Sequence, residues 1–355
     1  MSAVERTETQ AARAPEASST QAAWAPGASS TRAARKQGAR TQVPGVQGAG
    51  ARGAGVRVRV PAKVNVQLAV GAARPDGFHD LANVFLAVGL YDEITVTPAD
   101  ELRITCSGPD AHQVPLDESN LAARAAIALG ARHGIEPRVH IHIDKDIPVA
   151  GGMAGGSADG AGALLACDAL WSLGSSREEL LALCSELGSD VPFSLLGGAA
   201  LGTGRGERLT PLDVGGAFHW VFAVADGGLP TPAVYGEFDR LTEGTDVPAP
   251  AADPALVEAL RTGDPVALAA TLANDLQPAA LSLRPSLADT LTAGTAAGAL
   301  GALVSGSGPT TAFLAKDEDA ATRVAEALLA SGTCRTVRVA PAPAPGATVV
   351  GAEDG

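Results

Sequence analysis

The chain has 355 residues, of which 46% are hydrophobic, so it is long and apolar enough to bury the cores of two domains. Its formal net charge is −13 at pH 7, and a body this acidic repels phosphate backbones, which argues against nucleic-acid binding. No run of about eighteen apolar residues is present, which excludes a membrane-spanning helix.

The first 55 residues differ from the rest in composition. They consist largely of Ala, Gln, Ser, Thr, Gly and Arg without an apolar period, so they cannot bury enough surface to offset the entropy lost on ordering. We therefore expect residues 1–55 to be a disordered tail. A transit peptide, a solvated extension and a later start at a codon other than Met remain open for this segment.

The cysteines are spread along the chain, with no Cys-x-x-Cys spacing and no histidine placed to complete a zinc site. They are Cys106, Cys167, Cys184 and Cys334. This pattern is typical of buried thiols in a reducing cytosol. We expect a cytoplasmic protein with no metal site built from its own side chains.

Apolar residues recur at period two in some segments and at helical spacing in others. Strands are predicted over 56–70, with a break at Pro61, over 84–96, with an interruption at Gly89, and over 138–143, 199–202, 217–225, 302–305, 310–314 and 336–339. Helices are predicted over 119–133, 161–171, 177–187, 191–196 and 320–329, with others around residues 234, 256 and 281. Strands and helices mix without strict alternation, which favours an α+β fold whose second unit starts near residue 217. From residue 343 on, the chain reads as a loose end.

A glycine-rich loop leads directly into an apolar helix, and it is the strongest local signal in the chain. Four glycines allow the backbone to approach an anion closely, and the helix that follows offers unpaired N–H groups and the positive end of its dipole. No lysine follows the last glycines, so this is a phosphate loop of another kind than the Walker A motif. Its residues are Pro148, Val149, Ala150, Gly151, Gly152, Met153, Ala154, Gly155, Gly156, Ser157 and Ala158.

Two charged residues could serve in catalysis. Lys63 and Asn65 lie two residues apart on a predicted strand and therefore share a face, although a lysine there could simply meet solvent. Asp190 opens a short apolar helix, where capping alone would account for it. As a general base, Asp190 could take the proton of a substrate hydroxyl, with the ammonium of Lys63 stabilising the attacking oxygen.

These motifs occur together in one order. Pro-Ala-Lys-x-Asn at 61–65 is followed by the glycine loop, by Leu-Gly-x-Asp-Val-Pro-Phe at 187–193 and by Ser-Gly-Ser-Gly at 305–308. The set resembles the GHMP kinases over residues 56 to about 340. The resemblance implies a ribosomal protein S5-like N-terminal domain, which binds ATP, over 56–212, a ferredoxin-like C-terminal domain over 213–342, and an active site between them.

Two further segments resemble one branch of these kinases, which act on cytidyl-linked methylerythritol. They are Arg-Pro-Asp-Gly-Phe-His at 74–79 and Pro-Thr-Pro-Ala-Val-Tyr at 230–235. The resemblance implies that Phe78 and Tyr235 stack on the cytosine and that His79 bonds its edge, an arrangement that suits a planar base. Without it, each aromatic residue would be read as core and His79 as a loop residue.

The resemblance also assigns the remaining ligand contacts. It places Asn120 and Lys145 near the adenine and ribose of ATP, where a helix cap and a solvated strand end are the alternative readings. It adds Asn65 and Thr231 to the substrate site. Mg²⁺ is expected to accompany ATP, without a carboxylate cage of its own.

The function implied is transfer of the γ-phosphoryl group of ATP to the 2-hydroxyl of the cytidyl-linked substrate, in non-mevalonate synthesis of isoprenoid precursors. The expected partner is thus a small molecule, with neither nucleic acid nor membrane involved and the oligomeric state open. Another GHMP enzyme, such as homoserine kinase or a mevalonate-pathway kinase, would keep Lys63, Asp190 and the loop but would not need the two rings. A non-catalytic binding module would have lost the charged pair.

Overall fold

A computed structural model describes residues 55–149 and 151–350. The tail predicted over 1–55 therefore lies outside the described residues, except for Gly55, and so does Ala150 of the glycine loop. Among the helices that are described, none combines the length and the apolar character needed to cross a bilayer.

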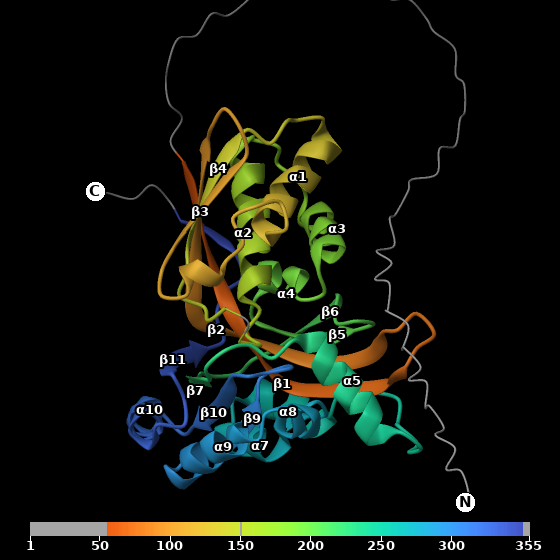
Figure 1. Cartoon of the computed structure of the whole chain (residues 1–355), viewed down its shortest axis with the longest axis vertical. Helices are drawn as coiled ribbons and strands as arrows, with labels where there is room; N and C mark the ends of the chain where they lie inside the picture. Colours follow the sequence, from red (N-terminus) through yellow and green to blue (C-terminus); the bar gives the residue numbers. More distant parts are fainter. Residues whose placement is uncertain (1–54, 150, 351–355) are drawn as a thin grey trace, which may run out of the picture. The chain divides into compact units, whose positions relative to one another are not determined.

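The first sheet has eight strands around a long antiparallel pair, β1 and β2 (Figure 1). Its order is β12-β1-β2-β4-β3, with β5 also on β2, β6 on β5 and β8 on β1. The strands are β1 (Val56–Ala73), β2 (His79–Pro98), β3 (Arg103–Ser107), β4 (Val139–Asp144), β5 (Ala199–Thr203), β6 (Arg208–Leu212), β8 (Ala273–Asn274) and β12 (Thr348–Val350).

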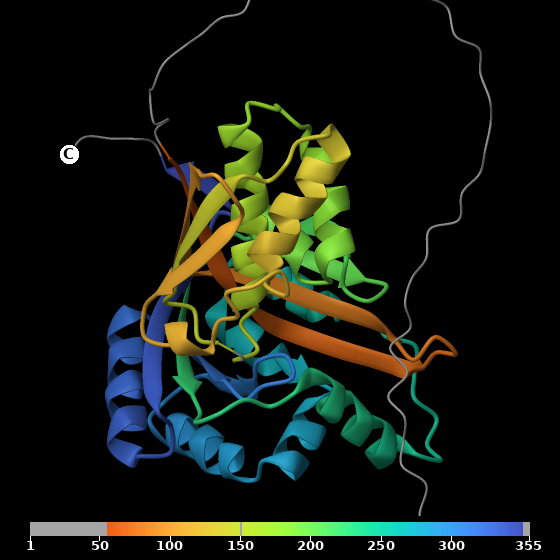
Figure 2. The same cartoon turned by 45° about the horizontal axis from the view of Figure 1, so that its top comes forward.

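The break predicted at Pro61 is a bulge inside a continuous strand. Pro61 pairs with Tyr91 but Ala62 pairs with Val88, so two residues of β2, including Gly89, have no partner at that point. Such extra residues bend and twist a strand without ending it. Figure 2 shows the β1–β2 ribbon running on beyond the bulge, away from the helices that cover its first half.

Helices cover one face of this sheet. The middle helix, α2, packs on β1 and β2 and is flanked by α1. It begins at the glycines, several residues before the predicted start. The elements are η1 (Ala111–Gln113), α1 (Leu121–His133), α2 (Gly155–Leu170), α3 (Arg177–Leu187) and α4 (Val191–Leu196).

The second sheet has four antiparallel strands in the order β11-β7-β10-β9. These strands are β7 (Phe218–Val224), β9 (Gly301–Val304), β10 (Thr311–Ala315) and β11 (Thr336–Ala342). The helices of this part are α5 (Thr231–Thr242), α6 (Pro254–Thr262), α7 (Pro265–Thr271), α8 (Gln277–Leu283), α9 (Ser286–Ala296) and α10 (Glu318–Ser331).

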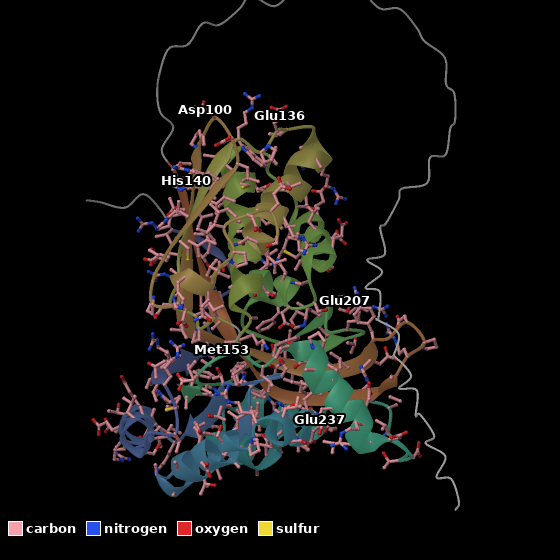
Figure 3. The ribbon with its side chains drawn as sticks, in the orientation of Figure 1. Asp100, Glu136, His140, Met153, Glu207 and Glu237 are labelled. Carbon is pink, nitrogen blue, oxygen red and sulfur yellow. The ribbon has the colours of Figure 1, made fainter. Side chains whose placement is uncertain are left out.

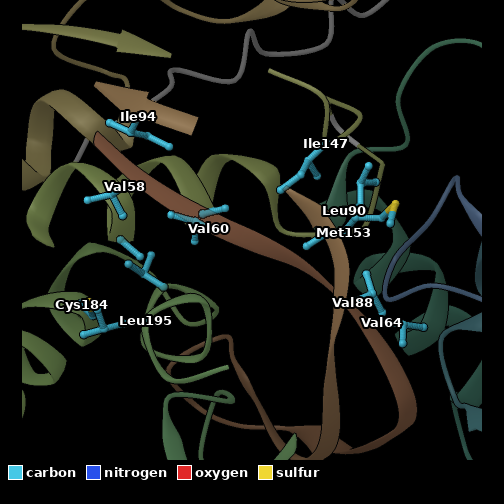
Figure 4. Close-up of a cluster of buried hydrophobic side chains, with 14 of the residues drawn as sticks. Val58, Val60, Val64, Val88, Leu90, Ile94, Ile147, Met153, Cys184 and Leu195 are labelled. Carbon is cyan, nitrogen blue, oxygen red and sulfur yellow. The ribbon is translucent and has the colours of Figure 1, made fainter. Parts of the chain in front are cut away.

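The period-two pattern of β7 explains how the two sheets are joined. Trp220 and Phe222 point into the core that the first sheet shares with the second, whereas Val221 and Ala223 pack under α10. Figure 4 shows part of the shared core, where Leu90 lies beside Met153 of the glycine loop and Val64 and Val88 lie together nearby.

The end of the chain differs from the expectation of a loose segment from residue 343 on. Over 343–350 it crosses back to the first sheet and its helices, where Ala347 N donates to Ser194 O of α4 and β12 pairs with β1. Strand β12 is only three residues long and follows Pro-Ala-Pro, so its sequence pattern does not predict a strand. It forms because it pairs with the edge of β1. Residues 351–355 lie outside the described part.

Candidate active site

A cleft of about 850 Å³ lies where the two sheets meet. Its walls come from β1 and β2, the glycine loop, the start of α4, the β5–β6 turn, α5 and the loop over 306–308. In Figure 3, Glu207 marks the β5–β6 turn and Glu237 marks α5, the two segments that bound one end of the cleft.

Lys63 lies at the base of the cleft on β1. Its side chain is buried, and Nζ donates to Oδ1 of Asn65 (2.5 Å) and to the carbonyl oxygen of Gly152 (3.0 Å). Oδ2 of Asp190 is 3.5 Å from the same nitrogen. Burial lowers the pKa of Lys63, because desolvation disfavours the ammonium, and the charge of Asp190 opposes that effect.

Asp190 occupies the N-cap position of α4, as its sequence context indicated, but its side chain makes no capping hydrogen bond. The side chain is 32% exposed and lines the cleft. The carboxylate is therefore open to a ligand on one side and close to the Lys63 ammonium on the other. Capping does not account for this aspartate.

The glycine loop presents its middle residues to the cleft. The lining residues are Gly151, Gly152, Ala154, Gly155, Gly156 and Ser157, and α2 starts within them at Gly155. Ala154 precedes the helix in the left-handed conformation (φ 61°). The N–H groups of the first helical turn, which have no partner inside the helix, therefore begin at the cleft wall.

The two ends of the loop and Met153 are not exposed to the cleft, and Met153 anchors the loop. Pro148, Val149, Met153 and Ala158 are not among the lining residues. The Met153 side chain is buried in the shared core (Figure 4), and its carbonyl oxygen accepts from Lys63 N (3.3 Å). The loop position is thus tied to the strand that carries the ammonium.

The second sheet also holds the loop. Ser305, at the end of β9, donates from Oγ to the Gly152 carbonyl (3.1 Å), which already accepts from Lys63. The side chain of Asn274 donates to the carbonyl oxygens of Val304 and Gly306, both at 2.7 Å. The late Ser-Gly-Ser-Gly motif therefore fixes the glycine loop from the side of the second sheet.

The opposite end of the cleft carries the aromatic residues. Phe78, His79 and Tyr235 all line it, and the ring centroids of His79 and Tyr235 are 5.0 Å apart. Phe78 is 48% exposed, and the guanidinium of Arg205 lies 5.0 Å from its ring. Burial raises the pKa of Tyr235, with a contribution from the charge of Asp190, so its hydroxyl remains protonated.

Thr231 starts α5 and faces the loop over 306–308, whose Gly306 lies beside Lys63 and Asn65. Its Oγ1 is 2.9 Å from Oγ of Ser307, and both residues line the cleft. Asn65 lines it as well, and its Nδ2 donates to Oδ1 of Asn83 (2.8 Å), so the amide is held with its oxygen toward Lys63. Both side chains expected to meet the substrate therefore face the cleft.

The two residues expected near adenine are placed differently. Asn120 caps α1, where its Oδ1 accepts from Ala122 N (2.8 Å), as in the alternative reading of that residue. Nζ of Lys145 is enclosed by the carboxylates of Asp92 (2.5 Å) and Asp159 (2.9 Å), with all three side chains at most 3% exposed. Neither Asn120 nor Lys145 is among the lining residues, so their contact with ATP stays a prediction.

The buried trio of Lys145, Asp92 and Asp159 lies directly beneath the loop. A Cβ atom at Gly155 would be 2.8 Å from Lys145 Nζ. Burial raises the pKa of Asp92 to about 7. Burial alone would lower the pKa of Lys145, but Asp159 and Asp92 together outweigh it and raise that pKa.

Sequence reasoning missed Asn83, Arg205 and Asp239, all of which line the cleft. Asp239 could have been found, because it lies four residues after Tyr235 and hence on the same face of the predicted helix. Arg205 and Asn83 gave no such signal, since strand pairing and turn geometry bring them to the site.

Both parts of the chain match known families. The GHMP kinases N terminal domain matches residues 120–198 and the GHMP kinases C terminal matches residues 256–333. A 4-diphosphocytidyl-2-C-methyl-D-erythritol kinase of Streptomyces avermitilis is 79% identical over 295 residues, which cover 83% of this chain and 99% of that protein. The kinase of the same name from Streptomyces coelicolor is 74% identical over 296 residues, with the same coverage.

Solved structures agree with these matches. The crystal structure of a 4-(cytidine 5'-diphospho)-2C-methyl-D-erythritol kinase has a TM-score of 0.66 and 35% identity, and the match covers 81% of this chain and 99% of that one. A homoserine kinase from Cytophaga hutchinsonii has a TM-score of 0.60 at 20% identity, covering 83% and 97%. At that identity the second match shows a common fold alone.

Proposed function

Since this chain belongs to the 4-diphosphocytidyl-2-C-methyl-D-erythritol kinases, a branch of the GHMP kinases, we propose that its cleft phosphorylates the 2-hydroxyl of that cytidyl substrate. The predicted family and its α+β fold are confirmed, and ATP is the phosphoryl donor. The matched residues 120–198 and 256–333 fall inside the predicted domains 56–212 and 213–342, whose boundaries remain a prediction.

The observation that carries the proposal is that a single cleft holds both a charged pair and an aromatic–histidine group. The Lys63–Asp190 pair borders the glycine loop, where α2 begins. Phe78, His79 and Tyr235 line the other end. A substrate that joins a base to a hydroxyl through a diphosphate spans two such ends, which a homoserine- or mevalonate-sized substrate does not need to do.

In the proposed reaction Asp190 accepts the proton of the attacking hydroxyl, a role that contributes about 10²- to 10⁴-fold. Lys63 donates its remaining N–H to the attacking oxygen, and its charge stabilises the transferring phosphoryl group, while its hydrogen bonds to Asn65 and Gly152 hold it in place. The loop N–H groups bind the remaining phosphates. Because phosphoryl transfer depends mostly on alignment and charge stabilisation, this anchoring matters as much as the base.

We further propose that Mg²⁺ arrives with ATP and neutralises charge on its phosphates. Among the described residues no group of three or more His, Cys, Asp and Glu side chains could hold a metal ion. This fits a Mg²⁺ ion that is bound mainly by phosphate oxygens and water. Ser157 and Asp190 are among the lining side chains that could add an oxygen ligand.

A cytoplasmic location and a role without nucleic acid also belong to the proposal. Four free thiols fit a reducing compartment. The net charge of −13 disfavours nucleic-acid phosphates.

The test is an ATP-consumption assay in which the cytidyl substrate, homoserine and mevalonate are offered in parallel. We expect turnover of the first alone. Asp190→Asn should lower kcat by about 10²- to 10⁴-fold, and Lys63→Met by about 10²- to 10³-fold. Turnover of homoserine or mevalonate would be consistent with a GHMP kinase but would refute the proposal that Phe78, His79 and Tyr235 bind cytosine. Turnover of none, with a folded protein, would favour a binding module.

A further inference from the structure

One cleft residue has a task that the proposed reaction does not assign. Asp239, on α5, places Oδ1 2.8 Å from Nε2 of His79, at the start of β2. The His79 side chain is only 4% exposed and lies between other side chains, 5.0 Å from the Tyr235 ring and 5.9 Å from that of Phe238. Its position is therefore fixed from three directions.

The carboxylate also determines which ring nitrogen carries the hydrogen. A carboxylate can only accept, so Nε2 of His79 must donate to Asp239. In a neutral imidazole the other nitrogen then has a free lone pair and acts as an acceptor. Within the described part of the chain, Nδ1 forms no hydrogen bond, and His79 lines the cleft, so Nδ1 is the nitrogen left for a ligand.

We propose that Asp239 is a positioning residue that makes His79 a hydrogen-bond acceptor and so selects cytosine over uracil. This deepens the proposed function and rests on it. Cytosine carries an exocyclic amino group, which donates, where uracil carries a carbonyl oxygen, which accepts. An acceptor at Nδ1 pairs with the amino group and faces the carbonyl with two lone pairs opposed.

Without Asp239 the discrimination weakens, because the proton can move from Nε2 to Nδ1 once no carboxylate holds it. The ring then donates to uracil as readily as it accepts from cytosine. If Asp239 merely held α5 against β2, its loss would weaken binding of both bases to the same extent. The ratio of the two affinities therefore separates a positioning role from a structural one.

The first experiment measures binding of CDP and of UDP by calorimetry at pH 8 to the wild type, Asp239→Asn and Glu243→Gln. The Glu243 variant is the matched control, since it removes an exposed carboxylate from the C-terminal end of the same helix. We expect the wild type to prefer CDP by about tenfold or more, and Asp239→Asn to bring the two affinities within about threefold, as the loss of a mispairing penalty implies. Glu243→Gln should keep the wild-type ratio.

The second measurement reads the tautomer directly by long-range ¹⁵N NMR of the free protein, with His79→Gln to assign the signal. We expect hydrogen on Nε2 in the wild type and a mixture of tautomers in Asp239→Asn. Hydrogen on Nδ1 in the wild type, or an unchanged CDP-to-UDP ratio in a folded Asp239→Asn protein, would overturn the inference. Neither readout requires turnover, so an inactive wild type would refute the proposed function and still leave this inference decided.

Discussion

The two ends of the cleft are built in different ways. At the reaction end, Lys63 is 4% exposed, and its backbone and side chain are hydrogen-bonded to the glycine loop, which Ser305 holds from the second sheet. At the base end, Phe78 is 48% exposed and Arg205 lies on an exposed turn. The first end is tied to both sheets by backbone and side-chain hydrogen bonds, and the second end joins the buried ring of His79 to exposed side chains on the rim.

This difference indicates where each property of the enzyme resides. In the proposed reaction, alignment of the phosphoryl group depends on backbone positions that cannot move without disturbing the core, whereas recognition of the base depends on side chains. Substitutions at the reaction end should therefore reduce both stability and kcat. Substitutions at the base end should change KM and base preference and leave the fold intact.

The largest difference between the two ends of the cleft is expected for alanine substitutions at two glycines with the same backbone conformation. Gly152 and Gly77 have φ values of 74° and 79°, so alanine would add about 1–2 kcal/mol of strain at either position. At Gly152 a Cβ would also overlap the carbonyl oxygen of Ser305, whereas at Gly77 nothing lies within 4 Å. We expect Gly152→Ala to abolish turnover, measured as kcat. Gly77→Ala should lower the free energy of unfolding in urea by the strain alone. Equal losses would contradict the distinction between the ends.

Arg205 tests the base end alone. Its guanidinium faces the Phe78 ring at 5.0 Å, a contact worth about 0.5–1 kcal/mol at an exposed site. Arg205→Ala should raise KM for the cytidyl substrate about two- to fivefold and leave kcat and KM for ATP unchanged. Arg208→Ala, at the start of β6 three residues later and outside the lining residues, is the control. A fall in kcat for Arg205→Ala would show that the rim takes part in alignment.

The buried trio under the loop should give the reaction end a pH-dependent stability. Folded Asp92 keeps its proton up to a pKa of about 7, whereas the unfolded chain loses it near the ordinary value of 3.8. Across that interval the folded state binds more protons, so its stability falls as pH rises. Relative to Asp92→Asn, the wild type should lose free energy of unfolding between about pH 4 and 7, as measured by denaturant unfolding at several pH values. A constant difference would show that Asp92 is ionised throughout.

The residues at each end also differ in how far the sequence predicts them. Lys63, Asp190 and the glycine loop can be recognised in the sequence from residue type and local spacing. The distance of 3.5 Å between Lys63 and Asp190 cannot be predicted in that way, since a strand bulge and the packing of α4 bring the two side chains together. Lys145 shows the limit most clearly. The family resemblance implies a ligand contact for it, but only the fold places Asp92 and Asp159 around it.

Helices and strands were predicted more reliably than the residues at which they begin and end. The helix over 177–187 has the bounds of α3, because a capping box at Ser176 and Glu179 marks its start. Helix α2 begins six residues before the predicted start, since glycines argue locally against a helix and tertiary packing overrides them. The return of residues 343–350 to the first sheet depends on a partner strand almost the whole chain away, which local patterns do not report.

The smallest effect is expected at Ala154, which holds the left-handed conformation (φ 61°) just before α2. Glycine relieves about 1–2 kcal/mol of strain there but gives the unfolded chain more freedom, worth about 0.4–1 kcal/mol. Ala154→Gly should therefore raise the free energy of unfolding by about 0.5–1 kcal/mol, measured by urea unfolding. Ala169→Gly, at an exposed position inside the same helix, should lower it by about 1 kcal/mol. If both substitutions destabilise equally, the loop tolerates alanine without strain, and the rigidity of the reaction end comes from its hydrogen bonds alone.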